Sequence, residues 1–368
     1  MREGVTYKRL GEVAPSQKYD GEITSVSGLY WLLNLDMVEP NTGNVIKKVM
    51  AAKEELDGSI TSFSPDNVLY SKLRPYLNKV VLPDECGYCT TELVPLCPKK
   101  DLLSREYLAY FLRSNTFVEF INDKVAGAKM PRVKMSDFWN HPIPIPSLST
   151  QELIVRELDS ISSVISAKKQ QVLELDNLAQ AIFLDTFGDP ISNTKGWEVA
   201  RIDSLCENLD YMRKPVTASD REAGDIPYYG ASGIVDYVKD YIFDGDYLLV
   251  SEDGANLLAR VTPIAFPISG KTWVNNHAHI LKFDEACTQR YVQSFLNSVD
   301  LSNIISGAVQ PKLNQANLNS YKIPLPPLSL QQAFAEKVQA IEEQKRLINQ
   351  SIAEFESLLA QRMEFHFA

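Results

Sequence analysis

Two long stretches of the chain place apolar residues at alternating spacings of three and four positions. They span residues 148–190 and 328–368, and their apolar positions fall in one shared register. These positions are Leu158, Ile161, Ile165, Val172, Leu175, Ala179 and Ile182 in the first stretch, and Val338, Ile341, Ile348, Ile352, Phe355 and Leu359 in the second. Such a pattern is the seam of a coiled coil, so each stretch predicts one long helix whose apolar side needs a partner.

The ends of both helices carry residues that start or stop a helix. The Pro-rich segments PIPIPSLS and IPLPPLS cannot be helical, and Ser149 and Ser329 are suitable N-cap residues after them. The first helix is predicted to end at Phe187-Gly188-Asp189-Pro190, and the second continues almost to the last residue. Because a single exposed helix of this length is not stable, we expect the two to pair. Lys168 and Lys345 interrupt the seam, as residues that set register and pairing do.

The two remaining segments, residues 1–147 and 191–327, have the pattern of mixed α/β modules. Short runs typical of strands occupy residues 67–70, 79–82, 92–96, 246–250, 260–266 and 272–283. Each module then contains one helix-like stretch, at residues 104–123 in the first and 288–305 in the second. The predicted order is therefore module, helix, module, helix.

An internal repeat relates the two halves at an offset of 180 residues. The segment GAKMPRVKMSDFWNHPIPIPSLSTQ begins at Gly127, and GAVQPKLNQANLNSYKIPLPPLSLQ begins at Gly307. The two align without a gap, and a period of half the chain indicates duplicated domains, because solenoid repeats are much shorter. We therefore expect an α+β fold in which two α/β modules are joined by two long antiparallel coiled-coil helices with pseudo-twofold symmetry.

Length and composition are those of an ordinary globular protein. The chain has 368 residues, of which 45% are hydrophobic and 23% charged, and about 150 residues per domain predicts two domains. The sequence has no apolar run long enough to span a membrane, and MREGVTYKRL resembles no signal or transit peptide. Five cysteines, an odd number, argue against a disulfide framework and fit a reducing compartment. We expect a cytoplasmic protein.

The net charge of −10 argues at first against nucleic acid as a partner. Its distribution weakens that objection, because residues 1–146 hold equal numbers of acidic and basic groups. Six of the ten excess negative charges lie in residues 147–190 and 328–368, the two predicted helices. A local basic patch on either module therefore remains compatible with DNA.

Three motifs suggest chemistry, and each lacks part of what that chemistry needs. Residues 265–272 satisfy a relaxed phosphate-loop pattern, but Pro267 removes an N–H and a strand-like segment follows where a helix is required. Cys86 and Cys89, with Cys97 beyond, have no second Cys pair to complete a zinc site, so a turn between two strands is favoured. His277 and His279 share one face of a predicted strand, but no third metal ligand is identifiable.

No catalytic triad, methyl-donor loop or nuclease motif can be assembled, which leaves binding as the expected role. The loop-like segment SKLRPYLNK combines cations with an aromatic and an amide, a mixture suited to phosphate and base-edge contacts. The predicted DNA-binding residues of the first module are Lys72, Arg74, Tyr76, Asn78, Lys79, Lys129 and Arg132, with Lys124 and Lys134 nearby. Those of the second module are Lys271, Asn276, Gln310 and Lys312, with Arg213, Lys214, Arg260 and Asn275 as further candidates. A solvated basic surface is the alternative interpretation of each residue.

The duplicated segment IP-[IL]-P-x-L-S-x-Q, followed by a long heptad helix, resembles the specificity subunit of type I restriction–modification systems (HsdS). SKLRPYLNK, YYGASG (Tyr228–Gly233) and WVNNHAHIL are similar to stretches of its target-recognition domains. The resemblance covers essentially the whole chain. It implies target-recognition domains at 1–147 and 191–327 and spacer helices at 148–190 and 328–368.

The resemblance also implies a function and partners. Each module would bind one half of a bipartite DNA target, and the helices would space the halves and dock two modification (methyltransferase) subunits. The chain itself would be non-catalytic and bind no cofactor, with S-adenosylmethionine in the methyltransferase and ATP and Mg in a restriction subunit. Two alternatives stay open: a coiled-coil adaptor whose modules bind proteins, and an enzyme that binds nucleotide through Gly270-Lys271-Thr272.

Overall fold

A computed structural model describes residues 5–56, 60–127, 129–307 and 309–368. Ala128 and Ala308, an identical pair of the repeat, lie outside the described residues. The chain divides into two compact units. Unit 1 comprises residues 1–169 and 350–368, and unit 2 comprises residues 170–349, so each long helix contributes one half to either unit.

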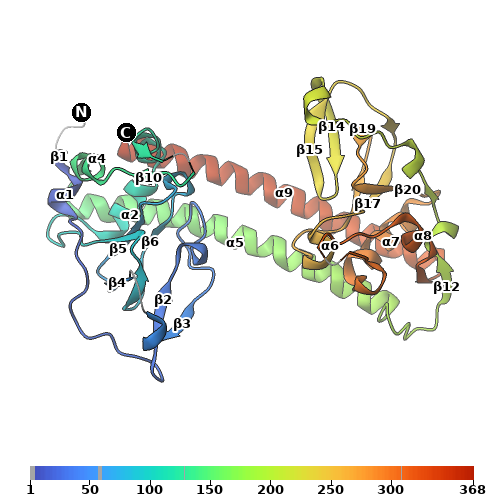
Figure 1. The fold of residues 1–368 in the computed structure, drawn as a ribbon, viewed down its shortest axis with the longest axis horizontal. Coiled ribbons are helices and arrows are strands. Elements are labelled where there is room, and N and C mark those ends of the chain that lie inside the picture. Colours follow the sequence, from blue (N-terminus) through green and yellow to red (C-terminus); the bar gives the residue numbers. More distant parts are fainter. Residues whose placement is uncertain (1–4, 57–59, 128, 308) are drawn as a thin grey trace. The chain divides into compact units, whose positions relative to one another are not determined.

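Unit 1 contains a four-stranded and a three-stranded sheet (Figure 1). The four-stranded sheet has the order β3-β2-β7-β4, and the three-stranded sheet has the order β6-β5-β8. Their strands are β2 (Leu29–Leu33), β3 (Val49–Ala52), β4 (Ile60–Phe63), β5 (Val68–Ser71), β6 (Val80–Val81), β7 (Gly87–Thr90) and β8 (Leu93–Leu96). The helices of the unit 1 module are α1 (Leu10–Val13), α2 (Arg105–Arg113), α3 (Asn115–Asn122) and α4 (Met135–Asn140). Two further strand pairs belong to it: β1 (Thr6–Arg9) pairs with β11 (Pro142–Ile145), and β9 (Val125–Ala126) pairs with β10 (Arg132–Val133).

Unit 2 contains two four-stranded sheets and repeats the closing elements of unit 1. The sheets have the orders β13-β20-β17-β18 and β15-β14-β19-β16. Their strands are β13 (Glu207–Asn208), β14 (Ala223–Gly230), β15 (Gly233–Val238), β16 (Phe243–Asp244), β17 (Tyr247–Ser251), β18 (Ala265–Ile268), β19 (Lys271–Val274) and β20 (Ala278–Lys282). The helices of this unit are α6 (Asn256–Ala259), α7 (Ala286–Ser298) and α8 (Gln315–Ser320), and β12 (Glu198–Arg201) pairs with β21 (Lys322–Leu325).

The long helices α5 (Leu148–Phe187) and α9 (Leu328–Phe367) run antiparallel within each unit. In unit 1, Lys169 pairs with Glu356 at 2.8 Å, and Glu157 contacts both Arg362 and His366. In unit 2, the Lys345 ammonium lies 2.6 Å from Asp176. The partner numbers fall along α9 as they rise along α5, so the predicted antiparallel pairing is confirmed.

The repeat extends to the packing of the helix ends. Phe183 and Phe187 of α5 are buried in unit 2, and Met363 and Phe367 of α9, at the same offset, are buried in unit 1. The Phe187 ring lies 4.9 Å from Tyr291, and the Phe367 ring lies 5.2 Å from Tyr107. Burial of one such phenyl ring contributes about 1.5–3 kcal/mol, so these apolar ends hold each helix pair to its module.

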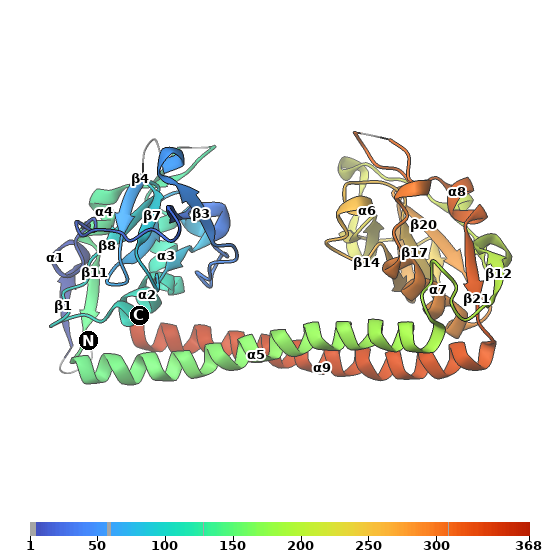
Figure 2. The ribbon, with the colours of Figure 1, turned by 90° about the horizontal axis from the view of Figure 1, so that it is seen from below.

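A strand pair leads into each long helix, as Figure 2 shows for β11 into α5 and β21 into α9. Helix α5 begins one residue after Ser147, whose hydroxyl accepts the Thr150 N–H, so Ser147 and not the predicted Ser149 is the N-cap. Ser329 likewise lies inside the first turn of α9, which begins at Leu328. A difference of two residues is within the usual uncertainty of helix ends.

Several local predictions from the sequence are wrong. Residues 260–264 precede β18 as a loop, and residues 272–283 form parts of two strands, β19 and β20, with a turn between them. Of the two cysteines predicted at a turn, Cys86 lies in the connection between β6 and β7 as expected, whereas Cys89 is buried within β7. The alternation of apolar and polar residues does not reveal where one strand ends and the next begins, because side chains alternate with a period of two in both strands of a hairpin.

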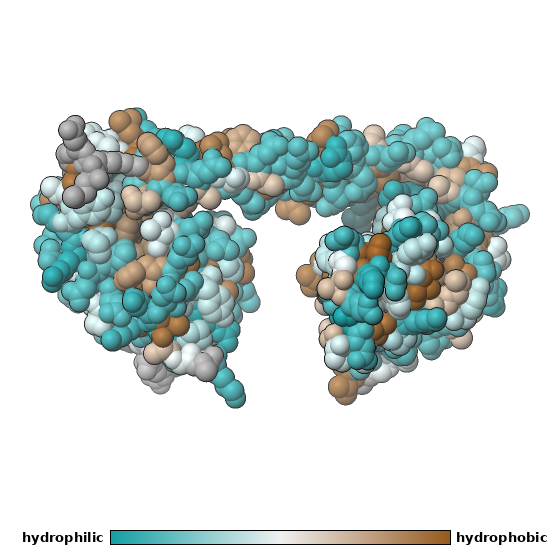
Figure 3. Space-filling view, turned by 90° about the horizontal axis from the view of Figure 1, so that it is seen from above, coloured by the Kyte–Doolittle hydropathy of each residue, from teal (hydrophilic) through white to brown (hydrophobic). Residues whose placement is uncertain are grey.

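The face of the long helices that Figure 3 shows is mainly hydrophilic, with apolar residues scattered among polar ones. Exposed apolar side chains on these helices include Leu153, Leu173, Leu347 and Phe365. In the described part of the chain, we find no helix with the length and hydropathy needed to cross a membrane.

Candidate nucleic-acid interface

In unit 1 the candidate interface begins where β5 ends. The strand is buried over its whole length, and the Ser71 hydroxyl donates to the Leu73 carbonyl just after it. Arg74 then has φ of +49° and Asn78 has φ of +48°, conformations that L residues adopt rarely. These two left-handed residues bound a short 3-10 turn, η3 (Pro75–Leu77), and leave the side chains of Arg74 and Tyr76 exposed.

Two backbone hydrogen bonds join this loop to the repeat segment after Gly127. The Arg74 N–H donates to the Pro131 carbonyl at 2.8 Å, and the Val133 N–H donates to the Lys72 carbonyl at 2.9 Å. Between them Leu73 and Arg132 form an isolated antiparallel bridge. Two loops that lie about sixty residues apart in the sequence therefore share one edge, which we call the unit 1 junction (residues 71–76 and 129–133).

The unit 1 junction brings together most of the cations predicted for the first module. Arg74, Lys129 and Arg132 are exposed there, and Lys72 is half-buried. The Arg132 guanidinium donates from Nη2 and Nε to the Glu92 carboxylate, at 2.9 Å and 3.1 Å from Oε1. This fork fixes the plane of the Arg132 side chain while its outer edge remains in solvent.

Asn78 and Lys79 have internal contacts instead. The Asn78 amide donates to the Arg113 carbonyl at 3.0 Å, and the Lys79 ammonium donates to the Leu35 carbonyl at 2.6 Å. Burial lowers the pKa of Lys79 despite the charge of Asp36. Because both side chains hold elements of unit 1 together, we assign them structural roles and leave them out of the proposed interface.

Unit 2 contains the same backbone junction at the same offset. The Gly254 N–H donates to the Pro311 carbonyl at 3.1 Å, the Leu313 N–H donates to the Glu252 carbonyl at 2.8 Å, and Asp253 bridges Lys312. We call this the unit 2 junction (residues 251–256 and 309–313). Glu252, Asp253 and Gly254 here occupy the positions of Lys72, Leu73 and Arg74, so the backbone is repeated while two cations are replaced by an acidic residue and a glycine.

A group of ion pairs lies behind the unit 2 junction. Glu252 accepts from Arg213 at 2.5 Å and from Lys312 at 3.1 Å. His279, which has no solvent-exposed surface, lies 2.5 Å from an Asp210 oxygen through Nδ1 and 2.8 Å from the Leu313 carbonyl through Nε2. Both ring nitrogens therefore face an oxygen atom, one of a side chain and one of the backbone, and these two contacts fix the orientation of the imidazole.

This group of ion pairs was not predicted from the sequence. The ligand atoms of Asp210, Glu252 and His279 lie within 4.8 Å of one another, a spacing that suits a metal ion. Each of the three is already bound by hydrogen bonds, and Arg213 supplies the compensating positive charge. Burial raises the pKa of Glu252, but the Arg213 hydrogen bond and the His279 charge outweigh this effect and lower it overall. We interpret the group as an ion-pair network.

The two histidines do not share a strand face, contrary to the prediction. His279 lies in β20, whereas His277 lies in the turn before it and is exposed. The His277 ring nitrogen Nδ1 lies 2.8 Å from an Asp253 oxygen, which places it beside the unit 2 junction. Asn276, which precedes His277 and is also exposed, lies on the same turn.

The other predicted cations and amides of unit 2 have different surroundings. Lys312 and Gln310 are exposed at the unit 2 junction, beside Val309, whose side chain is fully exposed. Lys271 begins β19 and lies over the Tyr241 ring at 4.6 Å, at the opposite end of the strand from Asn276. Arg260 donates to the Leu296 and Val299 carbonyls, so it caps α7. Gly270 lies in the turn between β18 and β19, so the phosphate-loop segment is followed by a strand and not by a helix.

A family profile described as type I restriction modification DNA specificity domain matches residues 3–175 and 194–357. A putative type I restriction enzyme specificity subunit of Haemophilus influenzae is 35% identical over 140 residues, which are 38% of this chain and 36% of that protein. The MjaIX specificity subunit of Methanocaldococcus jannaschii is 25% identical over 69% of this chain and 65% of its own length. The matches thus cover from about a third to about two thirds of these relatives.

Solved structures share the fold over the whole chain. The type I restriction–modification S subunit from M. genitalium matches with a TM-score of 0.59 at 14% identity, covering 100% of this chain and 98% of its own. A structure described as the basis of complex assembly and conformational transition of the type I R-M system matches equally well, at 17% identity over 99% of this chain and 97% of its own.

Proposed function

Because this chain belongs to the type I restriction modification DNA specificity family, we propose that it is a DNA sequence-specificity subunit. Each unit binds one half of a bipartite target in double-stranded DNA. The long helices space the two halves and dock two methyltransferase subunits. The subunit acts in the cytoplasm and is itself non-catalytic; S-adenosylmethionine belongs to the methyltransferase, and ATP and Mg to any restriction subunit that joins.

One observation carries this proposal: two junctions with the same backbone carry different side chains at equivalent positions. Lys72 and Arg74 in unit 1 are replaced by Glu252 and Gly254 in unit 2 at the same hydrogen-bonding positions. An adaptor that binds two copies of one protein needs two similar surfaces. Two different half-sites need a common frame with different side chains, because base edges differ in their donors and acceptors.

The unit 1 junction supplies the groups that such a contact uses. The exposed Arg74 and Arg132 can donate in pairs to guanine or to a phosphate, and Lys129 is a point charge for the backbone. The unit 2 junction offers Gln310, and the turn beside it offers Asn276; both amides suit adenine edges. Lys312 is the exposed cation among the described residues of this junction. Lys72, Tyr76 and Lys271 remain further proposed contacts. Unit 2 therefore relies more on base-edge contacts than unit 1, and partner subunits supply the remaining clamp on the DNA.

Methylation mapping tests the proposal. The chain is co-expressed with its neighbouring methyltransferase, and methyladenine is mapped over the genomic DNA. We expect a two-part motif with a fixed gap that is present only when both proteins are expressed. Replacing residues 191–327 with the corresponding module of a relative should change one half of the motif and leave the other half and the gap unchanged.

The outcomes separate the proposal from its alternatives. A stable complex with the methyltransferase that leaves no motif would favour the adaptor. Binding of labelled ATP that Lys271→Ala abolishes would favour the nucleotide enzyme. A module exchange that alters both halves of the motif at once would contradict the assignment of one half-site to each unit.

A further inference from the structure

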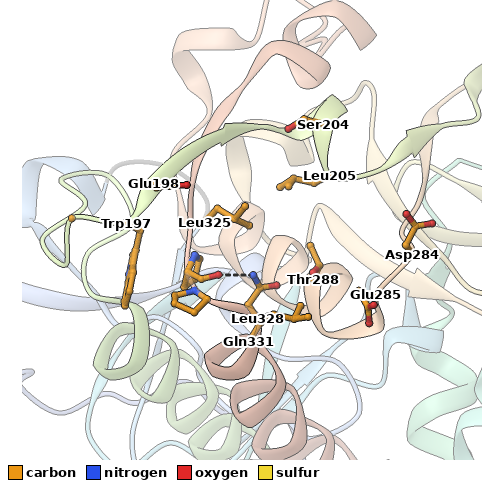
Figure 4. A pocket seen from close by; sticks show the side chains of 13 residues that line it. Trp197, Glu198, Ser204, Leu205, Asp284, Glu285, Thr288, Leu325, Leu328 and Gln331 are labelled. Atoms are coloured by element: carbon orange, nitrogen blue, oxygen red, sulfur yellow. Dashed lines mark hydrogen bonds between the residues drawn. The ribbon is translucent and has the colours of Figure 1, made fainter.

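An open pocket lies in unit 2 between β12, the start of α7 and the start of α9 (Figure 4). Its volume is about 620 Å³. Trp197 and Leu205 line it together with the prolines that precede α9, and Gln331 projects from the first turn of α9. The pocket is separate from the unit 2 junction, because the two share no residue.

Gln331 carries an unsatisfied acceptor in this pocket. The residue is 2% exposed, and its Nε2 donates to the Pro326 carbonyl at 2.7 Å. Its Oε1 is buried and has no hydrogen-bond partner among the described residues. In unit 1 the equivalent Gln151 is complete, since its Oε1 accepts the Ser104 N–H at 2.9 Å and its Nε2 donates to the Pro146 carbonyl. The unit 2 pocket therefore lacks a donor that unit 1 supplies from its own chain.

The charges around the pocket are all of one sign. Glu198, Asp284 and Glu285 are exposed and line it. Within the described ranges, none of these three carboxylates has an ion-pair partner within 4 Å. A buried acceptor and three unpaired carboxylates select a ligand that is a cation and a hydrogen-bond donor.

The indole ring of Trp197, which lines the pocket, favours one kind of cationic ligand over another. The indole N–H of Trp197 donates to the Phe187 carbonyl at 2.9 Å, which fixes the ring where it lines the pocket. A guanidinium stacks on an aromatic ring and still donates in its own plane, whereas an ammonium is a strongly hydrated point charge. Five N–H donors also match several acceptors better than three.

We propose that this pocket binds the guanidinium group of an arginine side chain presented by a partner polypeptide. The guanidinium donates to Gln331 Oε1 and is held by the carboxylates of Asp284 and Glu285, and the stem of the arginine side chain extends toward Trp197, which lines the opposite side of the pocket (Figure 4). Free arginine is the poorer ligand, because its own carboxylate is repelled by the three acidic groups. The inference does not depend on DNA recognition, since no residue of either junction takes part.

Titration of the full chain with N-acetyl-arginine amide tests the proposal. The indole ¹H–¹⁵N resonance of Trp197, assigned by its loss in Trp197→Phe, reports occupancy of the pocket. We expect a saturable shift with the arginine amide, a much weaker one with the neutral isostere N-acetyl-citrulline amide, and weaker binding of free arginine than of its amide. Binding of free arginine as tight as that of the amide would overturn the assignment to a polypeptide.

Matched variants distinguish the pocket from general surface charge. The exposed pair Asp284→Asn/Glu285→Gln should weaken binding several-fold, and Gln331→Met should weaken it further. Asp244→Asn/Asp246→Asn removes the same charge elsewhere in unit 2 and should leave binding unchanged. An indole resonance that does not move, or one that moves equally with citrulline amide or in both acidic double variants, would overturn the proposal.

Discussion

Substitution of Glu252 by Gln tests the ion-pair network behind the unit 2 junction. The residue is 8% exposed and accepts from Arg213 and Lys312 through its two carboxylate oxygens. The Gln side chain keeps one acceptor, turns a donor toward one of the two cations and leaves the buried Arg213 and His279 with less compensating charge. Because Glu and Gln have nearly the same shape, the substitution removes the charge without a large change in packing.

The magnitude follows from the burial of each partner. The Arg213 side chain is 13% exposed, so its bond to Glu252 belongs to the class of buried pairs whose rupture costs about 3–5 kcal/mol. Lys312 is 51% exposed, and solvent screens its contribution. Because Gln retains one hydrogen bond, we expect the free energy of unfolding of unit 2 to fall by about 3 kcal/mol, at the lower end of that range.

Hydrogen exchange measured by mass spectrometry resolves the two units within one molecule. A loss of about 3 kcal/mol corresponds to roughly a hundredfold faster exchange of the β17 and β20 amides. The β5 and β8 amides of unit 1 should not change. Glu92→Gln, which breaks the exposed pair with Arg132, is the matched control and should leave exchange in both units nearly unchanged.

The same measurement over a range of pH tests the charge of Glu252. Burial raises the pKa of this carboxyl, but the hydrogen bonds from Arg213 and Lys312 and the charge of His279 together outweigh burial and hold the pKa below its ordinary value. A carboxyl with a lowered pKa stabilises the folded state above its unfolded pKa of about 4.3, and this contribution is lost as the pH falls further. The difference between the native chain and Glu252→Gln should therefore shrink below about pH 4. A difference that is small at neutral pH, or one that does not shrink in acid, refutes the reasoning.

Three further predictions concern the junction, the helices and the core of unit 1. Arg74→Ala or Arg132→Ala should weaken DNA binding in gel shifts; loss of a base contact would cost about 1–3 kcal/mol and relax one target position, and loss of a phosphate contact would weaken all sequences alike. Absence of both effects would mean that DNA lies elsewhere. Removal of one heptad from each long helix should change the gap between the half-sites in methylation mapping without changing either half; an unchanged gap contradicts the spacer role. Burial among aromatic rings lowers the pKa of His141 to about 4. The folded state resists its protonation, so unit 1 should lose about 1–2 kcal/mol as the pH falls from 6.5 toward 4, and His141→Phe should remove this loss in exchange measurements. An equal loss of stability in the native chain and in His141→Phe would show that another group titrates.

The long helices were predictable from the sequence because their determinants are local and repeated. A seam residue recurs every three or four positions, and a proline segment precedes each helix, so many weak signals agree. Observed bounds of Leu148–Phe187 and Leu328–Phe367 lie within a few residues of the prediction. The 180-residue offset also indicated the duplicated modules, because an ungapped repeat preserves both spacing and residue type.

The unit 1 junction was only partly predictable. The cations of SKLRPYLNK and of the segment after Gly127 were recognised as separate basic stretches. Their convergence depends on the hydrogen bonds of Arg74 and Val133 to residues far away in the sequence. Asn78 and Lys79 could not be distinguished from their exposed neighbours, because the Arg113 and Leu35 carbonyls that bind them belong to other elements.

The sequence by itself therefore determined the helices, the duplication and the two basic segments of the first module, since periodicity and local composition are properties of neighbouring residues. Only the tertiary structure decided that Asp210, Glu252 and His279 meet, although they are up to 69 residues apart. It alone decided that Gln151 finds a donor in Ser104 while Gln331 does not. The physical reason is that a buried polar atom is satisfied or left unpaired by whatever the fold brings within about 3 Å of it, and sequence neighbours do not set that distance.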